Sequence, residues 1–503
     1  MDTVAVIVFV LLFAAVTVLG FMAARWRSGD LAVLHEWGLG GRRFGSWVTW
    51  FLLGGDLYTA YTFIAVPALM FGAGAIGFFA TPYTILAYPI LYMVYPKLWK
   101  VAHRHGCVTA ADYVRRRFDN RWLALAVAVT GILATMPYIA LQLVGMQVVI
   151  GALGFPTSGF AGELPLIIAF VILAAFTYTS GLRAPAMIAV VKDVLIYIAV
   201  IAAVIIIPEH LGGYAKVFAA VPKAKLLLAT PPAGNWGSFS AYATLAFGSA
   251  CALFLYPHSI TGVLSASSAN VVRRNAAYLP AYSVVLALLA LLGFMAIAAG
   301  VASMPQFAGG FKLYSNNFAI PALFLASFPS WFVGLAFAAI AIGALVPAAI
   351  MSIATANIFT RNIYREFISP NCTDAQESSM AKFISLVVKV GALVFIFAIP
   401  LQYALWLQLL GGVWIIQTLP SVILGLFARM LNGWALLLGW VAGFAWGTDL
   451  IISNHFAPIY PLHLMGTVIP CYIALIAVVV NIVVSFVLSP VLNAVCPGPR
   501  ELA

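Results

Sequence analysis

Lys192 and Asp193 stand next to each other inside an apolar stretch that runs over residues 186–207. Ionised groups are costly in so apolar a segment, so they are rare there and usually have a partner and a role. A buried lysine is also able to release its proton, because an apolar environment disfavours the ammonium form. Both residues are therefore candidates for ion coupling. Two simpler interpretations remain: Lys192 reaches the edge of the apolar layer along its aliphatic stem, or it pairs with a nearby carboxylate.

A further acidic residue, Asp56, directly follows the glycine pair Gly54 and Gly55 inside the apolar stretch 47–72. Glycines at such a place favour an interrupted helix. The second half of that helix then begins with backbone N–H groups at its positive end, where an anion binds. Asp56 itself is a candidate proton carrier or a counter-charge to Lys192. The simpler interpretation of the glycines is close packing or a kink.

A second apolar stretch, at 239–264, is interrupted by the run Tyr256-Pro257-His258. Two interrupted helices at matching places are typical of membrane proteins built from two inverted halves, with a binding site at the breaks. Polar groups near the breaks are able to hold a short carboxylate, although an interfacial tyrosine or a histidine bonded to a carbonyl explains each one alone. The residues that we expect around such a ligand are Gly54, Gly55, Tyr58, Thr59, Tyr61, Thr62, Tyr138, Gln142, Tyr256 and His258.

The helices that hold these residues follow from composition. Hydrophobic residues make up 64% of the 503 residues and charged residues only 8%, so the bilayer must be the solvent. Continuous apolar runs of about 20 residues predict spanning helices and exclude an outer-membrane barrel, whose strands alternate. We predict an all-α integral membrane protein with thirteen helices, at 3–24, 47–72, 77–96, 122–152, 163–181, 186–207, 239–264, 278–301, 331–358, 383–400, 403–427, 433–453 and 467–489.

Lysine and arginine residues gather in alternate loops and predict the orientation, because short cytoplasmic loops are rich in them. Arg25 and Arg43 fall in the first loop, and the third loop holds seven basic residues between 97 and 121. The opposite loops hold few, so we expect the N-terminus outside and the C-terminus inside. The net charge of +11 is then a signal of topology and not of nucleic-acid binding. The outer loops 208–238 and 302–330 are long enough for short helices that act as lids.

Four motifs stand out: Gly38-Leu-Gly-Gly-Arg-Arg-Phe-Gly, the Gly54-Gly55-Asp56 break, Tyr-Ile-Ala-Leu-Gln at 138–142 and Phe-Thr-Arg-Asn-Ile-Tyr at 359–364. Together they resemble the solute:sodium symporter family over nearly the whole chain. This resemblance implies a LeuT-type fold of five plus five inverted helices. The segments would be an extra helix and loop (1–46), the first repeat (47–207), an external loop (208–238), the second repeat (239–427) and two extra helices with a tail (428–503).

Three further segments resemble the monocarboxylate permeases within that family. They are the run that begins Leu34-His-Glu-Trp-Gly, His258 within Tyr-Pro-His, and Ser180-Gly-Leu-Arg-Ala-Pro-Ala. The resemblance implies import of lactate, pyruvate and related acids, with acetate, propionate or alanine as further candidates. We expect no enzyme activity, no cofactor, no metal and no nucleic-acid partner. The chain is expected to work as a monomer in a bacterial inner membrane.

The sequence departs from the family where its sodium ion would bind. Members place two adjacent hydroxyl residues on the helix corresponding to 331–358, and an alignment without gaps puts Val346 and Pro347 there. Neither side chain offers an oxygen, so the sodium cage is incomplete. An alternative alignment that uses Ser352 requires a deletion inside a helix.

Lys192 complements this departure, because sodium-independent transporters of this fold use a lysine from the equivalent helix as a substitute cation. Pro347 removes the helical bond to the carbonyl of Gly343. We hypothesise that the Lys192 ammonium donates to that carbonyl and to carbonyls near Gly54 and Leu57. The ion-coupling candidates are therefore Lys192, Asp193, Asp56, Gly343 and Pro347. Proton coupling is the leading hypothesis, and a sodium-coupled symporter of the same fold is the alternative.

Overall fold

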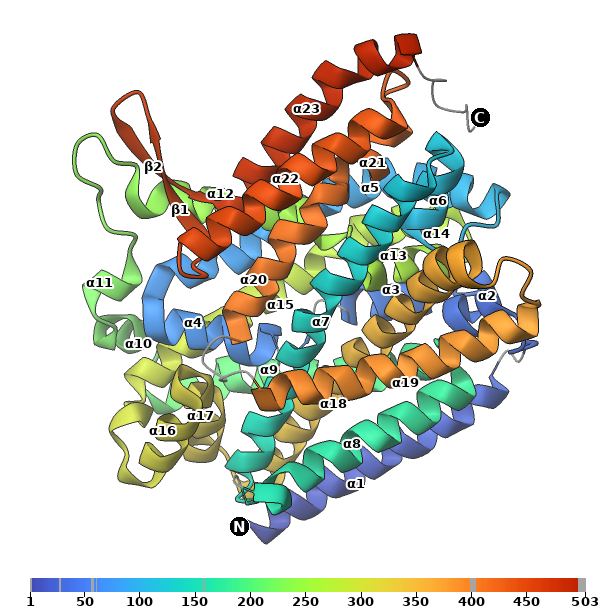
Figure 1. Cartoon of the computed structure of the whole chain (residues 1–503). Helices are drawn as coiled ribbons and strands as arrows, with labels where there is room; N and C mark the ends of the chain where they lie inside the picture. Colours follow the sequence, from blue (N-terminus) through green and yellow to red (C-terminus); the bar gives the residue numbers. More distant parts are fainter. Residues whose placement is uncertain are drawn as a thin grey trace.

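The structure is a computed structural model of the chain, and it describes residues 2–26, 29–55, 58–59, 61–156, 159–398 and 404–495. Long apolar helices make up most of it (Figure 1). The helices of the first half are α1 (Thr3–Met22), α2 (Leu34–Leu39), α3 (Ser46–Gly55), α4 (Val66–Ala73), α5 (Ala80–Arg104), α6 (Ala110–Phe118), α7 (Arg121–Ala152), α8 (Gly159–Ser180), α9 (Arg183–His210), α10 (Tyr214–Ala220) and α11 (Lys223–Leu226).

The second half is also largely helical and contains one pair of strands. Its helices are α12 (Gly237–Leu253), α13 (Pro257–Ser265), α14 (Ala269–Tyr278), α15 (Pro280–Ala298), α16 (Ala308–Tyr314), α17 (Ala319–Ser327), α18 (Ser330–Phe359), α19 (Asp374–Ala398), α20 (Ala404–Ile415), α21 (Leu419–Val422), α22 (Gly433–Ser453) and α23 (Ile473–Val495). Its strands are β1 (Ile459–Leu464) and β2 (Thr467–Tyr472).

The prediction of a mostly helical membrane protein is confirmed. Within the described ranges, ten helices are long and apolar enough to cross a membrane, or eleven if the bent pair α12 and α13 forms one span. The predicted segments 47–72 and 77–96 are not separated by a loop, because helical backbone runs from Thr62 to Arg104. The number of thirteen spans and the sides on which the termini lie stay predictions.

The hairpin of β1 and β2 corrects the prediction of an all-α chain and of a helix over 467–489. Residues 467–472 pair antiparallel with 459–464, and the helix begins only at Ile473. Met465 and Gly466 form the turn with positive φ angles of 48° and 79°. The run Thr-Val-Ile before Pro470 is β-branched, which favours a strand although it is as apolar as a helix.

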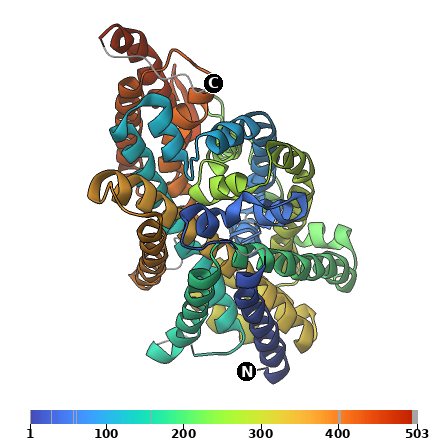
Figure 2. The same ribbon diagram turned by 90° about the vertical axis from the view of Figure 1, so that its right-hand side faces the viewer.

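Helix α18 forms the centre of the molecule and is buried along most of its length. Helices α1, α7, α9 and α19 pack around it (Figure 1). Helices α22 and α23 pack on each other at one end of the molecule, and the N-terminus lies at the other end in both views (Figures 1 and 2). The candidate site residues lie on α7, α9 and α18 of this central group, on α3 and α13, and in the break after α3 and the bend before α13.

Candidate functional site

The first interrupted helix breaks after the glycine pair. Helix α3 ends at Gly55, and helical backbone resumes at Tyr61 as a π-helical turn (Tyr61–Ala65) that leads into α4. The break therefore opens the backbone in the middle of the predicted helix 47–72. Asp56 and Leu57 lie outside the described residues, and so does the side chain of Tyr61.

Lys192 of α9 points at this break and is fully buried. Its ammonium donates to the carbonyl oxygen of Gly55 at 2.5 Å and to that of Tyr58 at 3.0 Å. The Asp193 carboxylate lies 3.0 Å away and balances its charge. The lysine therefore does not extend toward lipid. It pairs with a nearby carboxylate, as the second simpler interpretation has it, and it also bonds the two carbonyls at the break.

Gly343 of α18 lies beside the same group of oxygens. A Cβ atom on Gly343 would be 3.8 Å from the Tyr58 carbonyl oxygen. Among the described residues, however, the acceptors of Lys192 are Gly55 and Tyr58, so the hypothesised bond to the Gly343 carbonyl is not formed. The lysine joins α9 to α3, and α18 is held there by packing.

Tyr282 of α15 completes this group and was not among the residues predicted from the sequence. Its hydroxyl donates to the Asp193 carboxylate at 2.6 Å, and its own carbonyl accepts from the Tyr58 hydroxyl at 2.9 Å. The rings of Tyr58 and Tyr282 lie 4.7 Å apart between centroids. Pro280, two residues before Tyr282, marks the start of α15, but it does not indicate that Tyr282 reaches Asp193.

The glycine pair is required by close approach. A Cβ atom on Gly54 would lie 2.2 Å from the Tyr282 ring, and one on Gly55 would lie 2.9 Å from the Lys192 nitrogen. Real Cβ atoms do not come so near to other heavy atoms, so any larger residue displaces Tyr282 or Lys192. These distances support the close-packing interpretation of the glycines, and the anion site at the second half of the helix stays a prediction.

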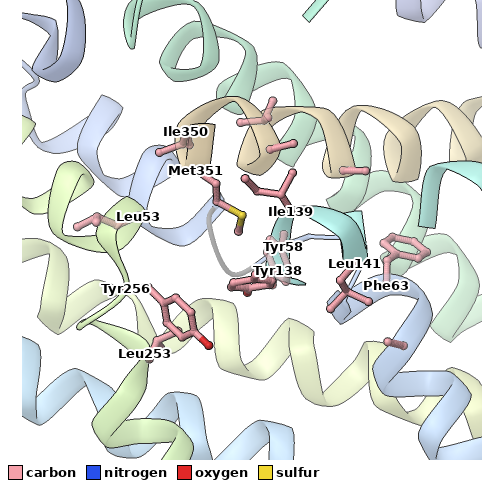
Figure 3. Packing of buried hydrophobic residues seen from close by; sticks show 14 of the residues in the cluster. Leu53, Tyr58, Phe63, Tyr138, Ile139, Leu141, Leu253, Tyr256, Ile350 and Met351 are labelled. Atoms are coloured by element: carbon pink, nitrogen blue, oxygen red, sulfur yellow. The ribbon is translucent and has the colours of Figure 1, made fainter. Parts of the chain in front are cut away.

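A second polar group surrounds the bend between α12 and α13, which is 50°. The ring centroids of Tyr138, Tyr256 and His258 lie 5.3 to 5.4 Å from one another, and all three side chains are buried. Figure 3 shows Tyr138 and Tyr256 together with Tyr58 in one buried cluster. The structure thus brings residues of α7, of the bend at the start of α13 and of the break after α3 to one place.

Several predicted ligand groups are bonded to the protein in this conformation. The Tyr256 hydroxyl donates to the Gln408 carbonyl at 3.2 Å, and the Gln142 amide donates to the Tyr138 carbonyl at 3.4 Å. The Thr62 hydroxyl donates to the Thr59 carbonyl at 2.9 Å. A ligand here would have to replace or share these bonds.

The two positions of α18 that the alignment without gaps predicts for sodium ligands carry no hydroxyl side chain. Val346 and Pro347 are buried apolar residues within α18. Ser352, the alternative candidate, donates to the Ala349 carbonyl at 2.8 Å and accepts from Ser385 of α19 at 3.4 Å. The Ser352 hydroxyl is therefore engaged with α19.

A buried ion pair fixes the segment before α3 to the start of α9. The Arg183 guanidinium donates to the Glu36 carboxylate at 2.5 Å and to the Glu36 carbonyl at 3.1 Å. Leu182 donates its backbone N–H to the Trp37 carbonyl at 2.9 Å. Sequence reasoning used both segments only for their resemblance to relatives, because a contact across about 150 residues leaves no local pattern.

Comparisons with known proteins agree on one family. The model of the sodium:solute symporter family matches residues 37–443. A monocarboxylate transport permease protein of Rhizobium johnstonii is 53% identical over 501 residues, which cover 98% of each chain. An uncharacterised symporter of Bacillus subtilis, YodF, is 36% identical over 91% of this chain and 89% of the relative.

A solved structure has the same fold. It is a sodium-coupled sialic acid symporter in a substrate-bound, outward-open state, and it superposes with a TM-score of 0.77 over 99% of both chains. Its sequence is only 14% identical, so this likeness concerns the fold alone.

Proposed function

Because the chain belongs to the sodium:solute symporter family, we propose that it imports short monocarboxylates such as lactate and pyruvate together with a proton. It is a multi-pass membrane protein and a transporter by family. We place it in a bacterial inner membrane and expect the monomer to be the working unit. Acetate, propionate and alanine are further candidate substrates.

The substrate class rests on the name and closeness of one relative. The permease of Rhizobium johnstonii carries monocarboxylate transport in its name and matches this chain from end to end at 53% identity. The chemistry of the second polar group is compatible with that class. Tyr138, Tyr256 and His258 offer hydroxyl and imidazole groups beside a helix break, and these groups hydrogen-bond a carboxylate without adding a buried charge.

The observation that carries the proposed coupling is the position of the Lys192 ammonium. It donates to the Gly55 and Tyr58 carbonyls at the broken end of α3, where backbone oxygens would otherwise be available to a metal ion. A helix C-terminus carries partial negative charge, which favours a cation. The side chains of Val346 and Pro347 supply no oxygen from the α18 side. A covalently attached cation then does the work of a bound sodium ion.

In this proposal the chain's own residues make two ties that must change during transport. Lys192 and Asp193 hold α9 to α3 and, through Tyr282, to α15. Tyr138, Tyr256 and His258 surround the substrate between α7 and α13. Exchange of a proton at Lys192 or Asp56 would loosen the first tie, and the bound acid would reorganise the second.

The test is uptake of labelled L-lactate into proteoliposomes of the purified protein. We expect an inward proton gradient to drive accumulation with sodium fully replaced by choline, and a protonophore to abolish it. A panel of lactate, pyruvate, acetate, propionate and alanine as competitors then ranks the substrates. Accumulation that requires sodium and ignores the protonophore would overturn the proposed coupling.

The second candidate is a sodium-coupled monocarboxylate symporter. Asp193 favours it, because this buried carboxylate offers a hard oxygen ligand next to the broken helix. Sodium binding would then require that Lys192 swing away from Gly55. A sodium-dependent thermal shift of the wild type, lost in Asp193→Asn, would select this candidate.

A further inference from the structure

A second buried lysine, Lys389 of α19, takes no part in the groups described above. Its side chain is 2% exposed. Its nitrogen contacts the Ser385 hydroxyl at 2.6 Å and the Ser385 carbonyl at 3.3 Å, one turn earlier in the same helix. Ser385 in turn donates to Ser352 of α18 at 3.4 Å. Lys389 therefore begins a short chain of hydroxyls that crosses from α19 to α18.

The orientation of α19 shows that Lys389 faces the protein and not the lipid. The outer face of this helix is apolar and exposed at Phe383, Val387, Val390 and Val394. Ser378, Ser385 and Lys389 lie on the opposite face and are buried. An amine that only extended along its stem to the membrane surface would lie on the outer or flanking face. The sequence instead aims this lysine into the helix bundle.

The surroundings of Lys389 contain no counter-charge in the part of the chain that the structure describes. Helix α18 brings no titratable group, and the acids of the other neighbours have basic partners elsewhere: Glu36 with Arg183, Glu366 with Arg115, and Glu377 with Arg361 and Arg365. The remaining titratable groups on the elements packed against α19, or on α19 itself, are Arg121, Tyr138, Glu163, Tyr178, His35, Tyr364, Asp374 and Lys382. None of them has a hydrogen bond or ion pair with Lys389 among the described residues.

This is the reverse of the situation at Lys192. The Lys192 ammonium has a carboxylate at 3.0 Å and two carbonyl oxygens, so its positive charge is compensated where it lies. Within the described ranges, Lys389 has only the two oxygens of one serine. A buried charge without a partner costs several kcal/mol, so the neutral amine and the charged ammonium differ strongly in free energy at this position. Such a residue has no structural advantage over methionine of similar length.

We propose that Lys389 is a proton-binding site inside the membrane, separate from the Lys192 site. The amine takes a proton on its lone pair and becomes an ammonium, and it returns that proton from the same nitrogen to water after transport. A bound monocarboxylate anion supplies the matching negative charge, so the loaded protein has the same net charge as the empty one. This inference rests on the proton coupling of the proposed function and assigns the coupled proton to Lys389 in place of Lys192 or Asp56, so that Lys192 keeps its charge as the fixed cation at the broken helix.

The connection to α18 gives the proton a way to affect transport. Protonation gives Lys389 a third N–H donor and a charge, and it removes the lone pair that the Ser385 hydroxyl could address. With the amine neutral, the Ser385 hydroxyl can donate to that lone pair instead of to Ser352, so the contact between Ser385 and Ser352 seen here differs between the two forms. Because α18 also packs Gly343 against Tyr58, a shift of α18 reaches the broken helix directly.

The experiment separates coupling from transport itself. Proteoliposomes with wild-type protein, Lys389→Met or Lys389→Gln are given labelled L-lactate under an inward gradient of about one pH unit, in choline buffer. The same liposomes are then assayed for lactate counterflow with equal pH on both sides. Lys382→Met is the matched control, since it removes a lysine from the same helix nearer its start. Counterflow also reports that each variant is folded.

We expect the wild type and Lys382→Met to accumulate lactate up to about tenfold per pH unit, which is the limit for one proton. Lys389→Met and Lys389→Gln should retain counterflow but reach an inside-to-outside ratio of about one under the same gradient. Gradient-driven accumulation in both Lys389 variants would overturn this inference and leave the proposed function standing. Loss of counterflow in both would make Lys389 a structural residue and overturn it as well. A wild type that accumulates lactate only with sodium would overturn the proposed function.

Discussion

The Arg183 guanidinium lies 2.5 Å from the Glu36 carboxylate, and both side chains are buried between residues 34–45 and the start of α9. Helix α9 carries Lys192, and residues 34–45 lead into α3, whose carbonyls Lys192 binds. The two ties therefore connect α9 to two consecutive segments of the chain, at α2 and at the end of α3. Breaking one should weaken the other.

The Glu36 and Arg183 pair is expected to be essential for stability. Glu36→Gln leaves the buried Arg183 guanidinium without its carboxylate, which costs about 3–5 kcal/mol. Arg183→Gln leaves Glu36 with the half-exposed Arg43 as its basic partner, so it should cost less than Glu36→Gln but more than Arg43→Gln. The double variant should recover part of that loss. Arg43→Gln, whose side chain is half exposed and 3.2 Å from Glu36, should cost less than about 1 kcal/mol. Thermal unfolding in detergent measures all four, and equal effects of Arg183→Gln and Arg43→Gln would contradict the prediction.

Lys192→Met should abolish lactate uptake and destabilise the protein, because Asp193 then keeps a buried charge without its partner, at a cost of about 3–5 kcal/mol. In Lys192→Met with Asp193→Asn, both charges are gone, so stability should return while uptake does not. Melting temperatures and uptake are measured on the same preparations. Undiminished uptake by Lys192→Met, driven by a pH gradient, would remove this lysine from the mechanism.

Gly54→Ala should disturb the site by steric conflict. The new Cβ atom would meet the Tyr282 ring at 2.2 Å, and overpacking of this kind costs about 1–3 kcal/mol. Uptake should fall together with stability. Gly45→Ala is the control, since a Cβ atom there meets nothing within 4 Å. Wild-type behaviour of both variants would show that the backbone yields easily at the break.

Tyr282→Phe tests the hydrogen bond to Asp193 without changing the ring. The loss of a donor to a buried carboxylate costs about 1–3 kcal/mol. We expect a lower melting temperature and slower uptake, and both effects should shrink when Asp193→Asn is already present. Tyr92→Phe, on an exposed tyrosine, serves as the control. Additive effects of Tyr282→Phe and Asp193→Asn would mean that the bond does not matter.

The orientation is testable at the hairpin of β1 and β2. Met465 at its tip is fully exposed, so Met465→Cys should react in whole cells with a maleimide that does not cross membranes. Arg116→Cys, on the opposite side by prediction, should react only after lysis. Burial raises the pKa of Cys107 to about 12, so this native thiol stays neutral and contributes little background. The reverse labelling pattern would invert the predicted topology.

The sequence alone was sufficient to predict that Lys192 is buried inside the protein and that the helix is interrupted at Gly54 and Gly55, because both signals are local. A charge or a glycine pair inside a long apolar run has few physical explanations. The acceptors of Lys192 were placed one residue too early, at carbonyls near Gly54 and Leu57, while the structure uses Gly55 and Tyr58. The spacing of residues in the sequence does not show how the backbone turns where a helix breaks, so it does not show which carbonyls face Lys192.

Other parts depend on how distant helices cross. Tyr282 reaches Asp193 from α15, and Arg183 reaches Glu36 across about 150 residues, so neither pair leaves a local pattern. The strand β2 was mistaken for helix because residues 467–472 are apolar, and apolarity alone does not separate the two. Its turn at Met465 and Gly466 was the missed signal.

Lys192 donates to the main-chain carbonyl oxygens of Gly55 and Tyr58. Every amino-acid residue has such an oxygen, whatever its side chain. No substitution at position 55 or 58 deletes an acceptor, so a change there acts on the tie only indirectly, as a Cβ atom on Gly55 does by meeting the Lys192 nitrogen at 2.9 Å. Loss-of-function alleles at these two positions would therefore report crowding or lost side-chain contacts. Mutagenesis alone would identify the lysine and not the main-chain oxygens that accept from it.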